Sequence, residues 1–466
     1  MLFNELQFIF FFIVVTILYY QLPQRGRVWL LLLASCYFYM VFMPIYILIL
    51  AVTIVVDYYA GIWIERAEGA KRKWLLIISL ISNVGFLAYF KYFNFFVKNV
   101  DFLAYKLNFD NPFDPLSILL PIGLSFHTFQ AMSYTIEVYR RNQPAERDFV
   151  VYSLYVMFYP QLVAGPIERP QNLLWQFHSK FKYDFENIKA GLMRIAWGMF
   201  KKVVIADRLS IVVHDVYGHA ADHNGLSLLI ATIFFTFQIY CDFSGYSDIA
   251  IGAARVMGFK LMENFDTPYF SKSISEFWRR WHISLSTWFR DYLYISLGGN
   301  RVSEARIYFN LFFVFMMSGL WHGANWTFVV WGSLHGIYLV LARLRDKFFD
   351  FSLPQKPFFS FINIVFTFVL VMLTWIFFAA NGMSHALLIL KKIFGLSIRD
   401  TIQSPLNNTE MIFCWILIAL LMLKDRFIKF ISTDNTPKFY FVFITLLILT
   451  YFFGVFSSNQ FIYFQF

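Results

Sequence analysis

Residues 307–342 read IYFNLFFVFMMSGLWHGANWTFVVWGSLHGIYLVLA, and no Asp, Glu, Lys or Arg occurs between Arg306 and Arg343. A helix needs only about 20 apolar residues to cross a bilayer core of roughly 30 Å, so this run is longer than one pass requires. Both flanks are basic and therefore favour the cytosol, which predicts two passes. His322 then lies near the far end or the middle of the first pass, where a titratable side chain faces a bundle interior or a water-filled cavity.

The whole chain has the composition of a membrane protein. Its 466 residues are 59% hydrophobic, 21% aromatic and only 15% charged, which leaves too few polar side chains to cover a soluble globule. Apolar segments lie near 7–20, 28–43, 44–64, 74–96, 118–138, 190–206, 227–241, 307–342, 358–380, 411–423 and 438–456. The shorter ones are expected to be re-entrant or interfacial. The sequence thus predicts an all-α polytopic membrane protein with a single domain over 1–466.

The distribution of basic loops predicts the topology. The first segment lacks a basic n-region and a small-residue cleavage site, so we expect a retained helix. Loops 65–73 and 140–147 are strongly basic, whereas 97–117 has mixed charge. Positive-inside counting then places the N-terminus outside, and the basic stretches 343–347 and 423–429 place the C-terminus outside as well.

The charge and the cysteine content argue against a nucleic-acid-binding protein, a disulfide-stabilised protein and a metal-binding protein. The net charge of +10 is spread over short loops, so topology explains most of it and no nucleic-acid partner is expected. The alternative interpretation is that basic residues contact anionic lipid heads or the phosphates of a cytosolic cofactor. Cys36, Cys241 and Cys414 are scattered without CxxC spacing, which argues against a disulfide scaffold or a metal site. The sequence also lacks GxSxG, Walker, GxGxxG and HExxH motifs.

The stretch SISEFWRRWHISLSTWFRDYLYISLGGNR (273–301) predicts an amphipathic helix. Ser273 and Glu276 fit a capping box at its start, and Gly298-Gly299 can end it. Its apolar stripe is Trp278, Trp281, His282, Leu285, Phe289, Tyr292 and Leu293. Taken alone, this pattern indicates an interfacial helix with belt tryptophans and a hydrogen-bonded core histidine. The alternative is a cavity wall with His282 on its polar floor.

A second histidine favours the cavity. Gly319 and Gly323 flank His322 and permit close approach of another backbone or of a substrate. Asn325 shares the face of His322 if the helix continues. Together with His282, these residues indicate a functional site in the middle third of the chain.

Other polar residues support weaker interpretations. Asp242, Ser244, Tyr246 and Asp248 lie together in DFSGYSD, and we expect the carboxylates to satisfy helix ends or to pair with basic residues such as Arg279 or Arg290. His127 and His335 lie in apolar segments, where a histidine is more often a packing residue than a substrate contact.

Two stretches resemble a known family. RRWHISLSTWFRDYLYISLGGNR (279–301) and MMSGLWHGANWTFVVWGSLHG (316–336) are similar to the membrane-bound O-acyltransferase (MBOAT) family, in particular its alginate O-acetyltransferase branch. Further stretches that resemble this branch are LPIGLSFHTFQAMSYTIEVYR (120–140), FYPQLVAGPIERP (158–170), YCDFSGYSDIAIG (240–252) and FIYFQF (461–466). The resemblance implies a ring of transmembrane and re-entrant helices around a thinned centre, where a cytosolic tunnel meets an outer funnel. The catalytic core is expected at about 118–345.

The resemblance also implies an activity. It makes His322 the catalytic residue and His282 the second polar position of an O-acetyltransferase, an acyltransferase of EC 2.3.1 type. Such an enzyme passes acetyl from a cytosolic thioester, expected to be acetyl-CoA, across a bacterial inner membrane towards an extracytoplasmic polysaccharide such as alginate. A separate periplasmic acetyltransferase is the expected partner, and no permanently bound cofactor or metal is expected.

The chemistry of histidine fits this role. A positioned base typically accelerates proton transfer 10²–10⁴-fold, and a buried imidazole stays neutral and able to accept a proton. We therefore expect His322 to activate the acceptor hydroxyl and His282 to orient the acyl group or stabilise the oxyanion. An acyl-histidine intermediate is the alternative.

Two further groups complete the predicted site. Candidate substrate-lining residues are Trp321, Asn325, Trp278, Trp281, Asp242 and Ser244. Candidate contacts to the donor phosphates are Arg140, Arg141, Lys201 and Lys202. The competing functions are transfer of D-alanyl or another acyl group to a cell-wall polymer and, in a different class, a proton-coupled transporter.

Overall fold

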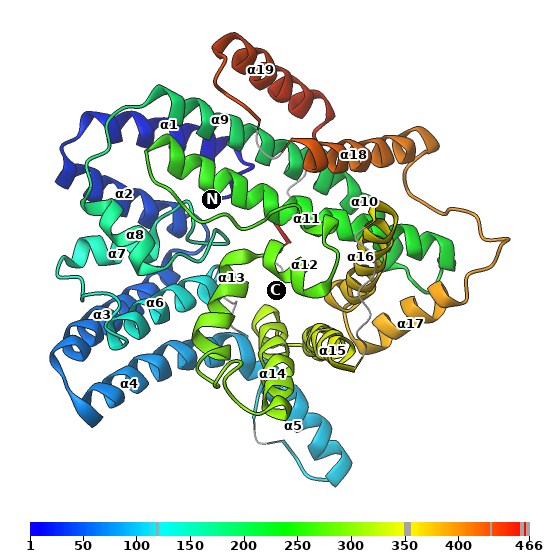
Figure 1. The fold of residues 1–466 in the computed structure, drawn as a ribbon, viewed down its shortest axis with the longest axis horizontal. Coiled ribbons are helices and arrows are strands. Elements are labelled where there is room, and N and C mark those ends of the chain that lie inside the picture. The colour runs from blue at the N-terminus through cyan, green and yellow to red at the C-terminus, as the bar shows by residue number, and fades with distance from the viewer. Residues whose placement is uncertain (112, 118–120, 349–355, 429–430, 457–460, 463–466) are drawn as a thin grey trace. The chain divides into compact units, whose positions relative to one another are not determined.

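The computed structural model describes residues 1–111, 113–117, 121–348, 356–428, 431–456 and 461–462, and its regular elements over these residues are helices (Figure 1). Residues 463–466, the end of the FIYFQF stretch, lie outside the described residues. The chain divides into two compact units, which are considered separately. The first is Met1–Ile195 with Tyr246–Met262, and the second is Ala196–Gly245 with Glu263–Phe466.

The first unit holds the N-terminal helices. These are α1 (Leu6–Gln21), α2 (Gln24–Met40), α3 (Ile47–Arg66), α4 (Gly69–Leu87), α5 (Phe93–Leu107), α6 (Leu124–Tyr139), α7 (Phe149–Met157), α8 (Pro170–His178) and most of α9 (Phe185–Met199). Helix α3 packs against α4 and α6. The buried Asp57 of α3 accepts hydrogen bonds from Ser79 Oγ (2.6 Å) and Asn83 Nδ2 (2.7 Å) of α4, so a carboxyl group within an apolar helix is satisfied.

The second unit holds the remaining helices. A π-helical turn η3 (Phe200–Ala206) leads into α10 (Asp207–Gly218), and α11 (Gly225–Val256) crosses from this unit into the first. The following elements are α12 (Ile274–Arg280), α13 (Ile283–Trp288), the π-helical η5 (Phe289–Tyr294), α14 (Glu304–His322), α15 (Trp326–Phe348), α16 (Pro357–Ala379), α17 (Met383–Phe394), α18 (Asn408–Phe427) and α19 (Thr436–Phe453). Helices α14 and α15 cover the run that was predicted to make two passes and lie side by side (Figure 1), and α15 is long and apolar enough to cross a membrane.

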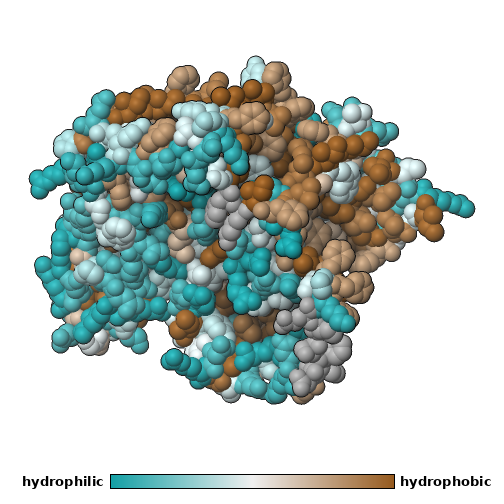
Figure 2. Space-filling view, turned by 45° about the horizontal axis from the view of Figure 1, so that its top comes forward, coloured by the Kyte–Doolittle hydropathy of each residue, from teal (hydrophilic) through white to brown (hydrophobic). Residues whose placement is uncertain are grey.

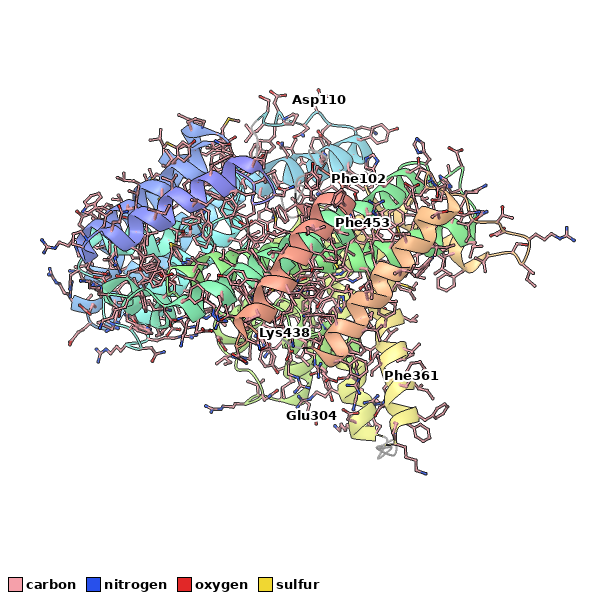
Figure 3. All side chains as sticks on the ribbon, turned by 90° about the horizontal axis from the view of Figure 1, so that it is seen from above. Phe102, Asp110, Glu304, Phe361, Lys438 and Phe453 are labelled. Carbon is pink, nitrogen blue, oxygen red and sulfur yellow. The ribbon has the colours of Figure 1, made fainter. Side chains whose placement is uncertain are left out.

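The described residues include six helical segments that are long and apolar enough to cross a membrane. They are Pro44–Arg66, Gly69–Leu107, Gly225–Val256, Trp326–Phe348, Pro357–Ala379 and Thr436–Phe453. Large apolar side chains are exposed on such helices. Phe361 on α16 is one of them and points away from the ribbon in Figure 3, and others lie on α19 between Lys438 and Phe453, which the same figure labels. Figure 2 shows hydrophobic residues gathered over part of the visible surface. A surface of this kind suits lipid, and the chain is a multi-pass membrane protein.

The prediction of one continuous helix over 273–301 is wrong. Helix α12 ends at Arg280, and His282 adopts the left-handed conformation (φ 44°) before α13 begins. The predicted end at the glycines is also wrong, because the last helical turn ends at Tyr294, and Gly298 and Gly299, which both have positive φ, follow in the turn beyond it. At the start, half of the predicted capping box forms, since Ser273 Oγ accepts from the Glu276 amide (3.1 Å). The Glu276 carboxylate accepts from the Lys272 amide, one residue before the cap.

Candidate active site

His282 lies in the break between α12 and α13. An extended segment runs antiparallel to this break, with an isolated bridge between Phe265 and Trp281 and a bond from the Asp266 amide to the Arg280 carbonyl (2.9 Å). The side chain of His282 is fully buried, and its Nδ1 lies 3.1 Å from Asn264 Oδ1. Burial lowers the pKa of His282 well below its usual value, so the ring is neutral.

His322 is the last residue of α14, at the start of the turn into α15. Glycines let the two helices approach closely: a Cβ on Gly319 would lie 2.2 Å from the carbonyl oxygen of Phe328, and one on Gly332 would lie 2.2 Å from that of Phe315. A Cβ on Gly323 would lie 2.1 Å from the Phe328 ring. Of the two predicted glycines, Gly319 therefore admits another backbone, as expected, whereas Gly323 admits an aromatic side chain.

The structure brings the two predicted histidines together. Their ring centroids are 6.4 Å apart at an interplanar angle of 58°, although they lie forty positions apart in the chain. Trp321 is next to both, with its ring 4.9 Å from His322 and 6.3 Å from His282. His322 is also met edge-on by Trp331 (5.1 Å) and Phe378 (5.3 Å). The spacing suits two imidazoles that flank one reacting group, and their catalytic role stays a prediction.

Trp278 of α12 and Trp281, which follows the helix, pack against surrounding aromatic rings. Trp281 lies against Phe277 (5.5 Å, stacked) and Trp375 (5.1 Å). Trp278 Nε1 donates to His335 Nδ1 (3.2 Å), so these contacts place both side chains in the protein interior. Whether either contacts substrate stays a prediction.

His335 joins three helices through both ring nitrogens. Because Nδ1 accepts from the Trp278 indole of α12, Nε2 carries the proton and donates to Thr374 Oγ1 of α16 (3.0 Å). Trp331 lies 5.1 Å from the His335 ring, the same distance as from His322. His335 is thus a packing residue, as the sequence indicated, and the Trp331 ring contacts both His335 and His322.

Asp242 and Ser244 belong to a buried polar cluster with two lysines. Lys202 Nζ lies 2.5 Å from Asp242 Oδ2 and 2.9 Å from Asp207 Oδ1, while Lys201 Nζ donates to Ser244 Oγ (2.7 Å). The expectation that the carboxylates of DFSGYSD pair with basic residues is confirmed for Asp242, and for Asp248, which lies 2.9 Å from Arg194 Nε, but the partners are not Arg279 or Arg290, the two named as examples. A buried carboxylate needs a nearby cation, and Lys202 on the adjacent π-helical turn provides it.

The cluster also anchors the end of the described chain. Asp242 Oδ1 accepts from the backbone amide of Ile462 (3.0 Å), and the Lys202 ammonium lies 4.5 Å from the centre of the Phe461 ring. Only 1% of Lys202 and 4% of Lys201 are exposed, so in this structure their side chains are directed into the protein. The prediction that they contact donor phosphates stays untested.

The remaining candidates are Asn325 in the second unit and Arg140 and Arg141 in the first. Asn325 does not share a helical face with His322, because α14 ends there; instead its Oδ1 accepts from the Thr327 amide (3.1 Å) and caps α15. In the first unit, Arg140 lies 3.7 Å from Glu137, and Arg141 has a positive φ of 63°.

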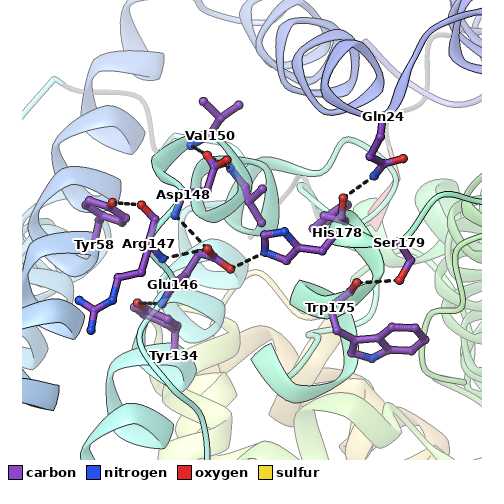
Figure 4. A network of polar contacts seen from close by, with 12 residues as sticks. Gln24, Tyr58, Tyr134, Glu146, Arg147, Asp148, Val150, Trp175, His178 and Ser179 are labelled. Atoms are coloured by element: carbon purple, nitrogen blue, oxygen red, sulfur yellow. Dashed lines mark hydrogen bonds and ion pairs between the residues drawn. The ribbon is translucent and has the colours of Figure 1, made fainter.

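A polar network fixes the end of this basic loop. Glu146 accepts from the backbone amides of Arg147 (2.8 Å) and Asp148 (2.9 Å) and contacts His178 Nε2 (2.9 Å) (Figure 4). The backbone amide of Glu146 donates to the Tyr134 hydroxyl (3.0 Å). These bonds position the loop that carries Arg140 and Arg141, whose contact with the donor stays a prediction.

The fold and the site define a polytopic helical membrane protein with two buried, neighbouring histidines. Residues 78–384 match the model of MBOAT, the membrane-bound O-acyltransferase family, and the chain belongs to this family. The resemblance predicted from the histidine motifs is thereby confirmed, and so is the prediction of an acyltransferase.

Relatives of known name fall into three groups. The probable alginate O-acetylase AlgI of Azotobacter vinelandii is 40% identical over 419 residues, which cover 88% of this chain and 81% of the relative. The peptidoglycan O-acetyltransferase of Helicobacter pylori is 37% identical over 435 residues, covering 85% and 80% respectively. The teichoic acid D-alanyltransferase of Streptococcus thermophilus is 31% identical over 291 residues, covering 56% of this chain and 69% of the relative.

Proposed function

We propose that this chain is an O-acetyltransferase that serves the acetylation of an extracytoplasmic polysaccharide. The matches to two relatives, one named for alginate O-acetylation and one for peptidoglycan O-acetylation, cover 88% and 85% of this chain. The match to the D-alanyltransferase covers only 56% of it. The observation that carries the proposal is the pair of buried histidines 6.4 Å apart in a chain of this family.

The chemistry of the transfer needs one base. His322 takes the proton of the acceptor hydroxyl while the oxygen attacks the carbonyl carbon of the acetyl thioester. The new C–O bond forms, the C–S bond breaks, and the thiolate that leaves receives the proton from His322. The products are an O-acetyl ester and a free thiol, so atoms and charges balance without a metal or a redox cofactor.

The donor and the partner follow from the same proposal. Acetyl-CoA is the donor on the cytosolic side of a bacterial inner membrane, and both chain termini lie on the opposite side. A periplasmic acetyltransferase completes the transfer to the glycan. Arg140, Arg141, Lys201 and Lys202 are the proposed contacts to the donor phosphates. The burial of the two lysines means that such contacts require a change in side-chain conformation.

The His322→Gln variant tests the role of the base. Glutamine keeps a similar size and a hydrogen-bonding side chain but cannot take a proton, so transfer of labelled acetyl from acetyl-CoA should fall by about 10²–10⁴-fold. Monodispersity and thermal unfolding of the purified variant verify that it is folded. Transfer at the wild-type rate by a folded His322→Gln protein would make His322 a packing residue.

The competing functions give different results in the same preparation. A D-alanyl transferase would use a D-alanyl carrier-protein thioester in preference to acetyl-CoA. A transporter would move solute into liposomes and leave acetyl-CoA unchanged. Either result with the wild-type protein would contradict the proposed acetyl transfer.

A further inference from the structure

Asn264 is a buried residue that contacts the helix break from eighteen positions upstream in the chain. Its side-chain oxygen lies within hydrogen-bond distance of three groups: His282 Nδ1 (3.1 Å), the Ser284 amide (3.2 Å) and Ser284 Oγ (2.9 Å). Its backbone carbonyl accepts from the amide of Ile283 (3.0 Å). One residue therefore contacts the histidine and both residues that follow it.

The identity of the Asn264 atom is fixed by chemistry. A backbone amide can only donate a hydrogen bond, so the side-chain atom that faces the Ser284 amide must be the carbonyl oxygen and not the amide nitrogen. A carbonyl oxygen can only accept. His282 Nδ1, which faces the same oxygen, must therefore carry a proton.

The state of the other ring nitrogen follows. A neutral imidazole has one N–H and one nitrogen with a lone pair. With the proton on Nδ1, the lone pair of His282 belongs to Nε2.

The contacts with Asn264 also stabilise the backbone of His282, which has φ of 44° and ψ of 54°. This conformation is uncommon for a residue other than glycine and persists only where surrounding contacts stabilise it.

We propose that Asn264 is a positioning residue of the active site, which holds His282 in its left-handed turn and in the Nδ1–H tautomer so that Nε2 meets the substrate as a hydrogen-bond acceptor. The catalytic part of this inference rests on the proposed acetyl transfer. Asn264 acts through His282 and touches no reacting atom, in the manner of the third group that orients a catalytic base.

The Nδ1–H tautomer restricts the bonds that His282 can make to a substrate. A neutral ring with its lone pair on Nε2 can accept an O–H of the bound acceptor and orient it while His322 removes the reacting proton. The same nitrogen cannot donate to a tetrahedral oxyanion. The two roles predicted for His282, orientation of the acyl group and stabilisation of the oxyanion, both need a hydrogen-bond donor, so the neutral ring with its lone pair on Nε2 fits neither, and orientation of the acceptor hydroxyl takes their place.

Nitrogen-15 NMR of histidine-labelled, full-length protein in lipid tests the tautomer directly, because protonated and lone-pair ring nitrogens have well-separated shifts. The His282 signal is identified by its loss in His282→Gln. The wild type should show the Nδ1–H form, and Asn264→Leu, which lacks the acceptor, should not. Asn264→Asp keeps an acceptor oxygen and should retain the Nδ1–H form. Ser284→Ala is the matched control, since it removes another donor to the same oxygen.

Acetyl transfer by the same variants tests the consequence. Asn264→Leu should lose about 10²-fold or more, as expected when a base or its orientation is lost, and Asn264→Asp should recover most of this loss. Ser284→Ala should transfer acetyl like the wild type. Equal losses in Asn264→Leu and Ser284→Ala would make the network merely structural and overturn the inference.

The two readouts separate this inference from the proposed function. The NMR signal does not depend on turnover, so an Nε2–H form of His282 in the wild type overturns the role of Asn264 whatever the protein transfers. An Nδ1–H form in a wild-type protein that does not transfer acetyl supports the positioning by Asn264 and contradicts the proposed function.

Discussion

At the scale of single residues, the three histidines of this region differ in what their ring nitrogens contact. Both nitrogens of His335 bond to neighbouring side chains, which leaves no nitrogen for a substrate. His282 has Nδ1 committed to Asn264. His322 is surrounded by aromatic rings, so it has little freedom to move and the reacting group must reach it. The proposed chemistry therefore involves His322 and His282, whereas His335 packs against the residues around them.

His335→Leu should destabilise the protein through Trp278. The leucine removes the acceptor of the buried indole N–H, and an unsatisfied buried donor costs about 1–3 kcal/mol. The midpoint of thermal unfolding in detergent measures the loss. In the double variant with Trp278→Phe the donor is also gone, so the combined loss should be smaller than the sum of the single losses. Additive losses would contradict the bond.

At the scale of elements, the α14–α15 hairpin depends on glycine. Gly319 and Gly332 face each other, and a Cβ on either would lie 2.2 Å from a carbonyl oxygen of the opposite helix. These carbonyl oxygens belong to the backbone, so they cannot move away from an added Cβ as the end of a flexible side chain can. The close contact of the two helices therefore positions His322 at the end of α14.

Gly319→Ala should force the two helices apart. Overpacking of this kind costs about 1–3 kcal/mol, and acetyl transfer should fall as well because His322 lies one turn further along the helix. Gly85→Ala on α4 is the matched control, because a Cβ there meets nothing within 4 Å and alanine favours a helix. Equal unfolding midpoints for wild type and Gly319→Ala would contradict this role of the glycine.

The sequence predicted the α14–α15 pair and both histidines but not the break at His282. The apolar stripe that includes Trp278, Trp281 and Leu285 continues at helical spacing across the break, and neither glycine nor proline marks it. The break depends on bonds from Asn264, which is remote in sequence, and no local pattern reveals such a contact. The partner of Asp242 was missed for the same reason, since Lys202 is forty positions away.

At the scale of the whole molecule, composition alone was enough to predict the class. A chain that is 59% hydrophobic exposes large apolar side chains on its outer helices, including Ile412, Ile416 and Leu420 on α18. The sequence could not predict how the chain divides into two compact units, because that depends on which segments pack together. The orientation in the membrane stays a prediction from the basic loops.

Cysteine labelling tests that orientation. In a background with Cys36, Cys241 and Cys414 replaced by alanine, a membrane-impermeant maleimide applied to intact cells should label single cysteines placed in 97–117. Cysteines in 65–73 and 343–347 should react only after permeabilisation, because basic loops face the cytosol. The reverse pattern at two of these sites would contradict the orientation. Phe466, a further predicted outer position, lies outside the described residues.

The most direct test of the account is vectorial acetyl transfer. Inside-out membrane vesicles are prepared from cells that produce either the wild-type chain or His322→Gln, and labelled acetyl-CoA is added outside. If His322 is the base, wild-type vesicles should contain acetyl label bound covalently to luminal material and protected from added hydrolases, and His322→Gln vesicles at equal protein level should contain about 10²-fold or more less label. Equal luminal label in both preparations, or label only on the outer, cytosolic face, would contradict the account.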